Sequence, residues 1–299
     1  MKQLLLICAV VVLVGGCGKA TKEKAAKIKA AADARVAAEK KATETATIPQ
    51  QPKTTSEKLI TDPILERAIR EQIYNRTGEL TKADLEKVTI LVLSSNKLTD
   101  VTGLEELTKL EELYLGDNQL TNVKGLENLT QLKKLSLTLN KLTSVKGLEN
   151  LTQLKQLNLQ SNELTDVKGV EKLTQLRSLT LFNNQLTEVK GLEKLTKLTG
   201  LLLNDNKLTE VKGLEKLTKL LFLDLRENQL TEVKGLGKLT QLEYLYLYSN
   251  QLTEVPKGLE KLTQLKNLWL NDNPDLTKAQ IAELQKALPK CEIRSNPTK

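Results

Sequence analysis

The sequence contains no histidine, and aromatic residues are scarce: one tryptophan, five tyrosines and two phenylalanines among 299 residues. Without an imidazole, the chain lacks both the most frequent general base of enzymes and the most frequent metal ligand. The sequence also shows no nucleophile–base pair, no metal-ligand cluster and no phosphate-binding loop. We therefore expect a non-enzymatic protein with no catalytic residue, no metal site and no cofactor.

The first residues have the features of a targeting segment. Lys2 supplies a positive charge, and an apolar run from Leu4 to Val14 follows, which is too short to span a bilayer. The run ends in VGGC at residues 14–17, which resembles the lipobox of bacterial lipoproteins. That resemblance implies a signal peptide at residues 1–16 and a Cys17 that carries a diacylglyceryl thioether and an acylated amino group, typically with palmitate. The alternative is an ordinary secretory signal with a chance cysteine.

A lipid on Cys17 implies a location in the bacterial cell envelope, because several acyl chains anchor a protein stably where one chain binds only marginally. Gly18 follows the cysteine where many inner-membrane lipoproteins have aspartate, which favours the outer membrane if the host has one. Of the other cysteines, Cys8 leaves with the signal and Cys291 has no partner for a disulfide. We expect Cys291 to be buried near the C-terminus.

Residues 17–56 form the next segment, which is rich in alanine, lysine, glutamate and threonine and almost lacks large apolar residues. This composition predicts a solvated, partly helical tether that ends in the flexible stretch IPQQPKTTS. A short coiled coil is the alternative. Residues 19–56 carry nine basic and four acidic residues, whereas residues 57–299 carry 35 and 33. The net charge of +8 is therefore concentrated near the N-terminus, and we expect no nucleic-acid partner.

The rest of the chain is an internal repeat. Its marker is an asparagine that returns every 22 residues and finally after 23, at positions 96, 118, 140, 162, 184, 206, 228, 250 and 273. The surrounding pattern, L-x-x-L-x-L-x-x-N-x-L, is typified by LEELYLGDNQL at residues 110–120. It resembles the leucine-rich repeat family, and most closely the bacterial repeats of internalins. The resemblance covers about residues 62–293, with Gly237 replacing a recurrent glutamate and Pro256 marking the one-residue insertion.

The repeat pattern predicts an α/β solenoid with one short strand in each repeat. The L-x-L pair alternates with a period of two, so its leucines face the interior. The asparagines should bond the backbone of successive turns, because buried amides require partners. The expected architecture is a curved horseshoe, with a parallel β-sheet on the concave face and short turns or 3₁₀ helices on the convex face.

An open solenoid needs capping elements at both ends. The segment TDPILERAIREQI resembles the helical cap of internalin-like domains, and Asp62-Pro63 begins it with a helix N-cap. Capping-box spacings at Thr81 and Thr277 predict two further helices. The domain boundaries are therefore a helical N-terminal cap at residues 57–87, leucine-rich repeats at residues 88–276, and a C-terminal cap helix and tail at residues 277–299.

Seven of the eight aromatic residues occupy the strand positions two, four or six residues before the repeat asparagine, whose side chains point away from the leucine core. They concentrate toward the C-terminal half, where one aspartate and one arginine join them. Equal positions of adjacent repeats lie about 4.8 Å apart, so these side chains should touch one another. The predicted partner-binding residues are Phe182, Phe222, Asp224, Arg226, Tyr244, Tyr246, Tyr248 and Trp269.

These features indicate a monomeric, envelope-anchored binding protein whose concave face recognises a protein or peptide. Tyrosine, tryptophan and arginine are frequent anchors of such contacts. Two alternatives stay open: binding of a polysaccharide or the cell wall, and a passive structural lipoprotein. In the last case the aromatic residues only pack across strands.

Overall fold

The computed structural model describes residues 58–74 and 77–296, which belong to one compact unit that begins at Lys58. The signal peptide, Cys17 and the tether lie outside the described residues, so the predictions about them stay predictions.

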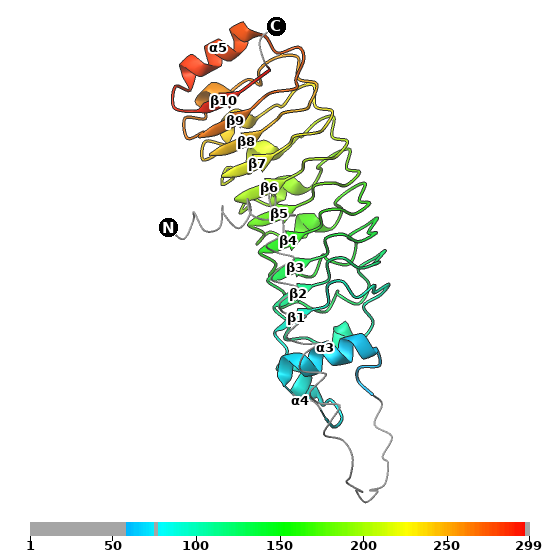
Figure 1. Cartoon of the computed structure of the whole chain (residues 1–299). Helices are drawn as coiled ribbons and strands as arrows, with labels where there is room; N and C mark the ends of the chain where they lie inside the picture. The colour runs from blue at the N-terminus through cyan, green and yellow to red at the C-terminus, as the bar shows by residue number, and fades with distance from the viewer. Residues whose placement is uncertain (1–57, 75–76, 297–299) are drawn as a thin grey trace, which may run out of the picture. The chain divides into compact units, whose positions relative to one another are not determined.

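Among the described residues, two helices precede the sheet (Figure 1). Helix α3 spans Pro63–Ile73 and α4 spans Lys82–Leu85. The Asp62 side chain accepts a hydrogen bond of 2.7 Å from the amide of Leu65, which confirms the predicted N-cap. The capping box at Thr81 is also present. Leu65 and Ile69 of α3 are buried, so this helix covers the leucines at the first end of the repeats.

Ten three-residue strands form a single parallel sheet in which each strand pairs with the next one in the chain (Figure 1). From β1 to β9 each central leucine lies beside the equivalent leucine of the next strand, as Leu113 does beside Leu135, and Leu268 of β9 lies beside Ile293 of β10. The strands are β1 (Ile90–Val92), β2 (Glu112–Tyr114), β3 (Lys134–Ser136), β4 (Gln156–Asn158), β5 (Ser178–Thr180), β6 (Gly200–Leu202), β7 (Phe222–Asp224), β8 (Tyr244–Tyr246), β9 (Asn267–Trp269) and β10 (Glu292–Arg294).

The repeat asparagines form the predicted ladder of hydrogen bonds. Asn206 is typical: its Nδ2 donates to the carbonyl oxygens of Leu181 and Leu203, both at 3.0 Å, and its Oδ1 accepts from the amide of Leu186 at 3.0 Å. The side chain thus joins two successive turns of the solenoid, its own and the one before it. Because Asn206 is only 8% exposed, these bonds satisfy backbone groups that water cannot reach.

The opposite side of the solenoid consists of turns and, in six places, 3₁₀ helices. These are η1 (Leu104–Glu106), η2 (Val170–Lys172), η3 (Leu192–Lys194), η4 (Leu214–Lys216), η5 (Leu236–Lys238) and η6 (Leu259–Lys261). A recurrent glutamate supports several turns, as where Glu171 Oε2 accepts a hydrogen bond of 2.6 Å from the amide of Gly169.

The structure explains the departure from the repeat at Gly237. A Cβ atom at this position would lie 2.9 Å from the Cα atom of Gly258, which is too close for any side chain. Pro256, the extra residue of this repeat, lies two positions before Gly258. The glutamate of the other repeats therefore has no room here.

The sheet is open and uncurled, since β1 and β10 are its two ends. The strong curvature of a horseshoe, which the sequence analysis expects, is not developed. Curvature arises when the back of a solenoid is wider than the strand spacing of about 4.8 Å, as with α-helices of about 10 Å diameter. The short 3₁₀ pieces here are narrower, so successive repeats stack almost in parallel.

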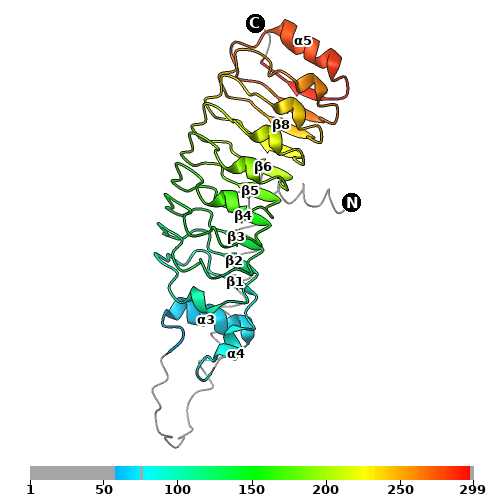
Figure 2. The ribbon, with the colours of Figure 1, turned by 180° about the vertical axis from the view of Figure 1, so that it is seen from behind.

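At the other end, α5 spans Lys278–Ala287 and begins with the predicted capping box at Thr277. Leu284 and Leu288 of this region are buried, and β10 then adds a last strand to β9. Cys291 is buried as expected, and burial raises the pKa of its thiol to about 11. Figure 2, seen from behind, shows α3 and α4 at the β1 end and α5 at the β10 end.

Candidate binding site

One surface of the sheet, the strand face, carries the side chains two, four and six residues before each repeat asparagine. Its C-terminal half holds a continuous group of rings, the aromatic platform, contributed by β7, β8, β9 and the second residue after β8. The platform consists of Phe222, Tyr244, Tyr246, Tyr248 and Trp269.

The rings of the platform contact one another across adjacent strands, as the repeat register predicts. Tyr246 and Trp269 are stacked with centroids 4.4 Å apart, and Tyr248 lies 5.9 Å from Trp269. Phe222 lies 6.2 Å from Tyr244 and meets Tyr246 edge-on at 5.3 Å. The tyrosines and Trp269 are half-buried, so each ring packs on its neighbours and also reaches solvent.

Three basic side chains border the platform, and each lies over a ring. The guanidinium carbon of Arg226 is 5.5 Å from the centroid of Tyr248, and that of Arg294 is 4.7 Å from Trp269. Lys266 Nζ is 5.9 Å from the ring of Tyr244. Arg226 additionally donates a hydrogen bond of 2.9 Å to the Tyr248 hydroxyl. The predicted contact of Arg226 with Tyr248 is therefore confirmed.

Two predicted site residues, Phe222 and Asp224, are less accessible than the sequence analysis expects. Both lie on the strand face, but Phe222 is 3% exposed and Asp224 is 0% exposed. Tyr244 and Tyr246 pack against Phe222, and Asp224 is aligned between Leu202 and Tyr246 of the flanking strands. Pointing away from the leucine core is thus not enough for exposure where large neighbouring side chains close over a residue.

Phe182 also differs from the expected arrangement. It is half-buried on the strand face, but it makes no ring contact among the described residues. Asn204, at the equivalent position of the next repeat, lies between Phe182 and Arg226. Tyr114 lies further away in β2, where its hydroxyl donates to Glu112 at 2.7 Å. The platform therefore excludes these two aromatic residues.

Asp224 is the most perturbed acid of the strand face. Burial raises the pKa of its carboxyl to about 7, although Arg226 and the amide hydrogen bond from Arg226 act in the opposite direction. The Arg226 amide donates to Asp224 Oδ1 at 3.2 Å, and Arg226 Nε lies 3.3 Å from Asp224 Oδ2 without forming a hydrogen bond. Asp224 Oδ2 thus has no hydrogen-bond donor among the described residues.

The sequence analysis did not include two acidic residues that lie beside the platform. Asp205 and Glu227 occupy the same position in adjacent repeats, directly before the asparagine, and both have left-handed backbone angles. The pKa of Glu227 is raised by its side-chain hydrogen bond with Asp205, by burial and by the charge of Asp205. Asn204 Nδ2 donates to Asp205 at 2.8 Å. Acidic residues at the same position of two adjacent repeats, directly before the asparagine, are the sequence signal that would have indicated this group.

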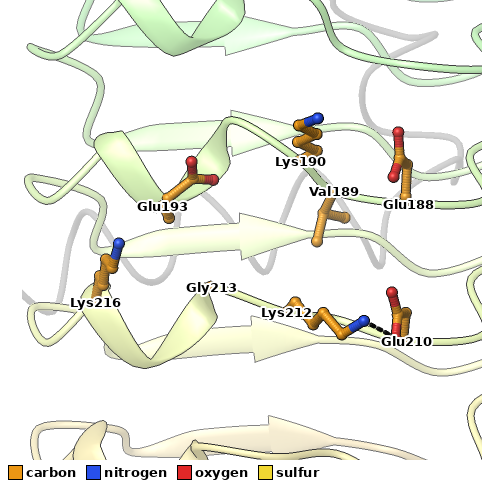
Figure 3. A pocket seen from close by; sticks show the side chains of 8 residues that line it. All are labelled: Glu188, Val189, Lys190, Glu193, Glu210, Lys212, Gly213 and Lys216. Carbon is orange, nitrogen blue, oxygen red and sulfur yellow. Dashed lines mark ion pairs between the residues drawn. The ribbon is translucent and has the colours of Figure 1, made fainter.

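The back of the solenoid offers a different kind of surface. A hollow of about 420 Å³ lies between two repeats and is lined by alternating glutamates and lysines, among them Glu210 and Lys212, which form an ion pair of 2.8 Å (Figure 3). A similar hollow of about 480 Å³ follows in the next repeat. Because the hollow recurs and its charges are balanced, we attribute it to repeat packing.

Two further observations limit the chemistry of the described residues. No three or more acidic or cysteine side chains there are grouped so that they could hold a metal ion. Among the same residues, no helix has the length and apolar character needed to cross a membrane.

The comparison with protein families agrees with this architecture. The model of Leucine Rich repeats matches residues 86–128, 130–172, 152–196, 174–216 and 240–285, which together cover more than half of the chain. The chain belongs to the leucine-rich repeat family. Proteins of this family are non-enzymatic scaffolds that bind other proteins. Among curated proteins, no match was found.

Several solved structures are similar. Internalin C2 of Listeria monocytogenes is 31% identical, with 72% of this chain and 93% of that chain covered at a TM-score of 0.67. An internalin F structure from the same organism is 26% identical, with 80% and 90% covered and a TM-score of 0.42. The plant peptide hormone receptor RGFR1, in complex with RGF2, is 26% identical, with 64% and 33% covered and a TM-score of 0.56.

Proposed function

We propose that this leucine-rich repeat protein is a monomeric binding protein of a bacterial envelope, anchored by a lipid on Cys17, and that its aromatic platform binds a protein or peptide. The family supports binding as the activity, and the receptor RGFR1 was solved with a peptide partner. The VGGC motif at residues 14–17 supports the anchor. The tether at residues 17–56 would hold the repeats away from the membrane.

The observation that carries the binding site is the concentration of half-exposed tyrosines and the only tryptophan in one half of an otherwise regular sheet. Packing alone would not require this bias, because the β3 and β4 repeats form the same structure with Ser136 and Asn158 in equivalent positions. Tyr, Trp and Arg are the residue types that dominate binding energy at protein interfaces.

A protein or peptide fits the platform better than a polysaccharide. A sugar would stack on a free ring face, but the ring of Trp269 lies between Tyr246 on one side of β9 and Arg294 on the other. The ring of Trp269 therefore offers a partner its edge rather than a free face. Such a surface accepts apolar side chains and backbone groups of a polypeptide.

The test is an unbiased crosslinking pull-down from envelope extract with the full chain, followed by affinity measurement with the partner identified. Replacing Tyr246 and Trp269 together with alanine should weaken binding by at least about 30-fold, because each is a candidate anchor worth about 2 kcal/mol or more. Tyr114→Ala is the matched control, since Tyr114 occupies the same position as Tyr246 in its repeat but lies outside the platform.

Thermal unfolding followed by circular dichroism separates binding from folding. The double variant should keep a cooperative transition, because the leucine core and the asparagine ladder are unchanged. Unaltered affinity of a well-folded double variant would show that the platform is not the site. Loss of the folded state would show that the rings serve the sheet itself.

A further inference from the structure

We propose that the polypeptide bound by the aromatic platform also carries an acidic stretch, and that this stretch binds to a group of basic side chains on β3 and just before β3, β4 and β5. This group, the basic stripe, consists of Lys133, Lys134, Lys155 and Arg177. The inference deepens the proposed function and rests on it, because one segment of the partner would contact both surfaces.

The charges of the strand segments are unevenly distributed along the solenoid. In the repeats of β3, β4 and β5, the seven residues before the asparagine (133–139, 155–161 and 177–183) include four basic residues and no acidic one. The same positions of the other six repeats include two basic and eight acidic residues. The net charge is therefore +4 in these three repeats and −6 in the others. Stacking of the repeats does not require this segregation.

Two members of the basic stripe lie side by side without an acidic partner. The amide of Arg177 donates to the carbonyl oxygen of Lys155 at 2.9 Å, so the two residues are neighbours on adjacent repeats, about 4.8 Å apart. Both side chains are exposed, and neither forms an ion pair or a side-chain hydrogen bond with the described residues. Like charges at neighbouring positions of adjacent strands are destabilising. An anion that binds between them would relieve this repulsion.

Other basic residues before or within the strands show how such charges are otherwise satisfied. Lys133 pairs with Glu111 at 2.6 Å, and Lys266 pairs with Glu243 at 2.7 Å. Lys134 pairs in the same way with an acid of the preceding strand, at 2.7 Å. Lys155 and its neighbour Arg177 are the exception to this pairing. This exception is independent of the overall charge distribution, and it also points to an acidic ligand.

The side chains next to the two unpaired cations are uncharged hydrogen-bonding groups. On β4 and β5 these are Gln156, Asn158, Ser178 and Thr180. A carboxylate accepts hydrogen bonds from guanidinium, ammonium, hydroxyl and amide groups, and an arginine can hold it with two parallel bonds. Aspartate and glutamate side chains therefore match this part of the strand face, whereas a basic segment would find no acidic residue there.

A peptide fits the basic stripe better than a uniformly charged polymer. Acidic residues follow the strands on both sides of it: Asp117 in the repeat of β2, and Asp205 and Glu227 in the repeats of β6 and β7. A polyanion with regular charge spacing that lay along the sheet would be repelled at these positions. A peptide can confine its acidic residues to the few positions that face the basic stripe.

The distance between the two surfaces suits one short segment. Arg177 precedes β5 and Tyr244 begins β8, so three strand spacings, about 14 Å in total, separate them (Figure 1). An extended chain covers this distance in about four residues, and the distance from β4 to β9 in about seven. Between Arg177 and Tyr244, Gly200 has no side chain and Phe222 is 3% exposed, so neither obstructs a chain that crosses the strands.

The experiment uses the immobilised full chain to select from a random library of linear 12-residue peptides. The selected peptides should contain aspartate or glutamate about four to seven positions from an aromatic or large apolar residue. Each is then synthesised in two forms, one as selected and one with its acidic residues replaced by asparagine or glutamine. Fluorescence anisotropy measures the affinity of both forms.

Against the unmodified chain, the amide form should bind at least about tenfold more weakly, which corresponds to about 1.4 kcal/mol. Against Lys155→Gln with Arg177→Gln, the difference between the two peptide forms should fall below about twofold. This variant loses only exposed side chains that repel each other, so circular dichroism should show an unchanged fold. Lys172→Gln with Lys194→Gln is the matched control, because it removes two exposed lysines from η2 and η3 on the opposite side and should preserve the tenfold difference.

The outcomes distinguish this inference from the proposed function. Peptides without acidic residues, or amide forms that bind equally well, would overturn the acidic-stretch inference, while weaker binding to Tyr246→Ala with Trp269→Ala would still support the platform. Acidic peptides that bind this platform variant with full affinity would contradict the proposed function and the shared segment with it. If no peptide is selected, both proposals fail. Polyphosphate that then binds the unmodified chain but not Lys155→Gln with Arg177→Gln would assign the basic stripe to an anionic polymer instead.

Discussion

Replacing Asp224 with asparagine should stabilise the protein at pH 8 and have little effect at pH 4. The reason is that the folded state raises the pKa of this carboxyl from 3.8 to about 7, chiefly by burial. Between these two pH values the folded state binds a proton that the unfolded state has released. Stability must therefore fall as the pH rises through this window. Asparagine cannot ionise, so it abolishes that dependence.

The magnitude follows from the difference in pKa between the two states. Each pH unit is worth about 1.4 kcal/mol, so a difference of about three units gives a loss of up to about 4 kcal/mol above pH 7. For a folded region of this size, about 1 kcal/mol shifts the thermal midpoint by roughly 2–4 °C. We expect the variant to melt roughly 8–16 °C above the unmodified chain at pH 8, and within about 2 °C of it at pH 4.

The assay is thermal unfolding of both full-length proteins in a series of buffers from pH 4 to pH 8. Glu227, Asp205, Arg226 and Tyr246 surround Asp224 electrostatically, and they are present in both proteins. The difference between the two curves therefore isolates Asp224. Equal midpoints at pH 8, or a difference that is largest at pH 4, would refute the assignment of Asp224 as a buried and poorly compensated acid.

Glu112→Gln is the matched control. Glu112 also lies on the strand face, but the pKa of its carboxyl is lowered, first by the hydrogen bond from Lys134 and then by that from Tyr114. Its contribution to stability is present at high pH and is lost only as the pH falls through the lowered value. Its replacement should therefore leave the slope between pH 5 and pH 8 unchanged.

Three further predictions test the scaffold and the anchor. Asn206→Ala should lower the free energy of unfolding by about 1–3 kcal/mol in urea titrations, because it leaves the buried amide of Leu186 unpaired and removes one of the two asparagine donors to each of the Leu181 and Leu203 carbonyl oxygens; an unchanged free energy of unfolding would contradict the ladder's role. Gly237→Glu should reduce stability by about 1–3 kcal/mol, since its Cβ would collide with Gly258, and an unchanged melting midpoint would count against that contact. Cys17→Ser should move the protein from the membrane to the soluble fraction, whereas Cys291→Ser should not; persistent membrane association of the first variant would argue against the lipid anchor.

The sequence specifies most of this fold because the repeat is simple. Alternation of Leu113 and Leu115 fixes which strand face is buried, and the asparagine fixes the turn after it. The contacts of Tyr246 with Trp269 and of Arg226 with Tyr248 follow from the register alone. Periodicity carries this information, so one repeat predicts the next.

Burial on the strand face was harder to predict, because it depends on the sizes of neighbouring side chains rather than on the repeat. Asp224 is covered because Tyr246 follows it on the next strand, whereas Val92 in β1 is 61% exposed. The acids Asp205 and Glu227 were missed for another reason. They sit one residue outside the alternating strand positions, where only the turn geometry brings them beside the platform.

In each repeat different residues hold the fold together and face the solvent, which explains how a binding surface can arise here at little cost to stability. Leucines and the asparagine complete the core and the hydrogen-bond ladder in every turn, so the side chains at the strand-face positions are not needed to hold the fold together. At such positions most repeats carry small polar groups such as Ser136 and Asn158. A buried carboxylate with one oxygen that lacks a donor, as in Asp224, is therefore not required by the fold. We attribute its cost in stability to selection for binding of a partner at that face. Measuring both the stability and the peptide binding of Asp224→Asn tests this explanation, because the variant should gain stability and lose binding.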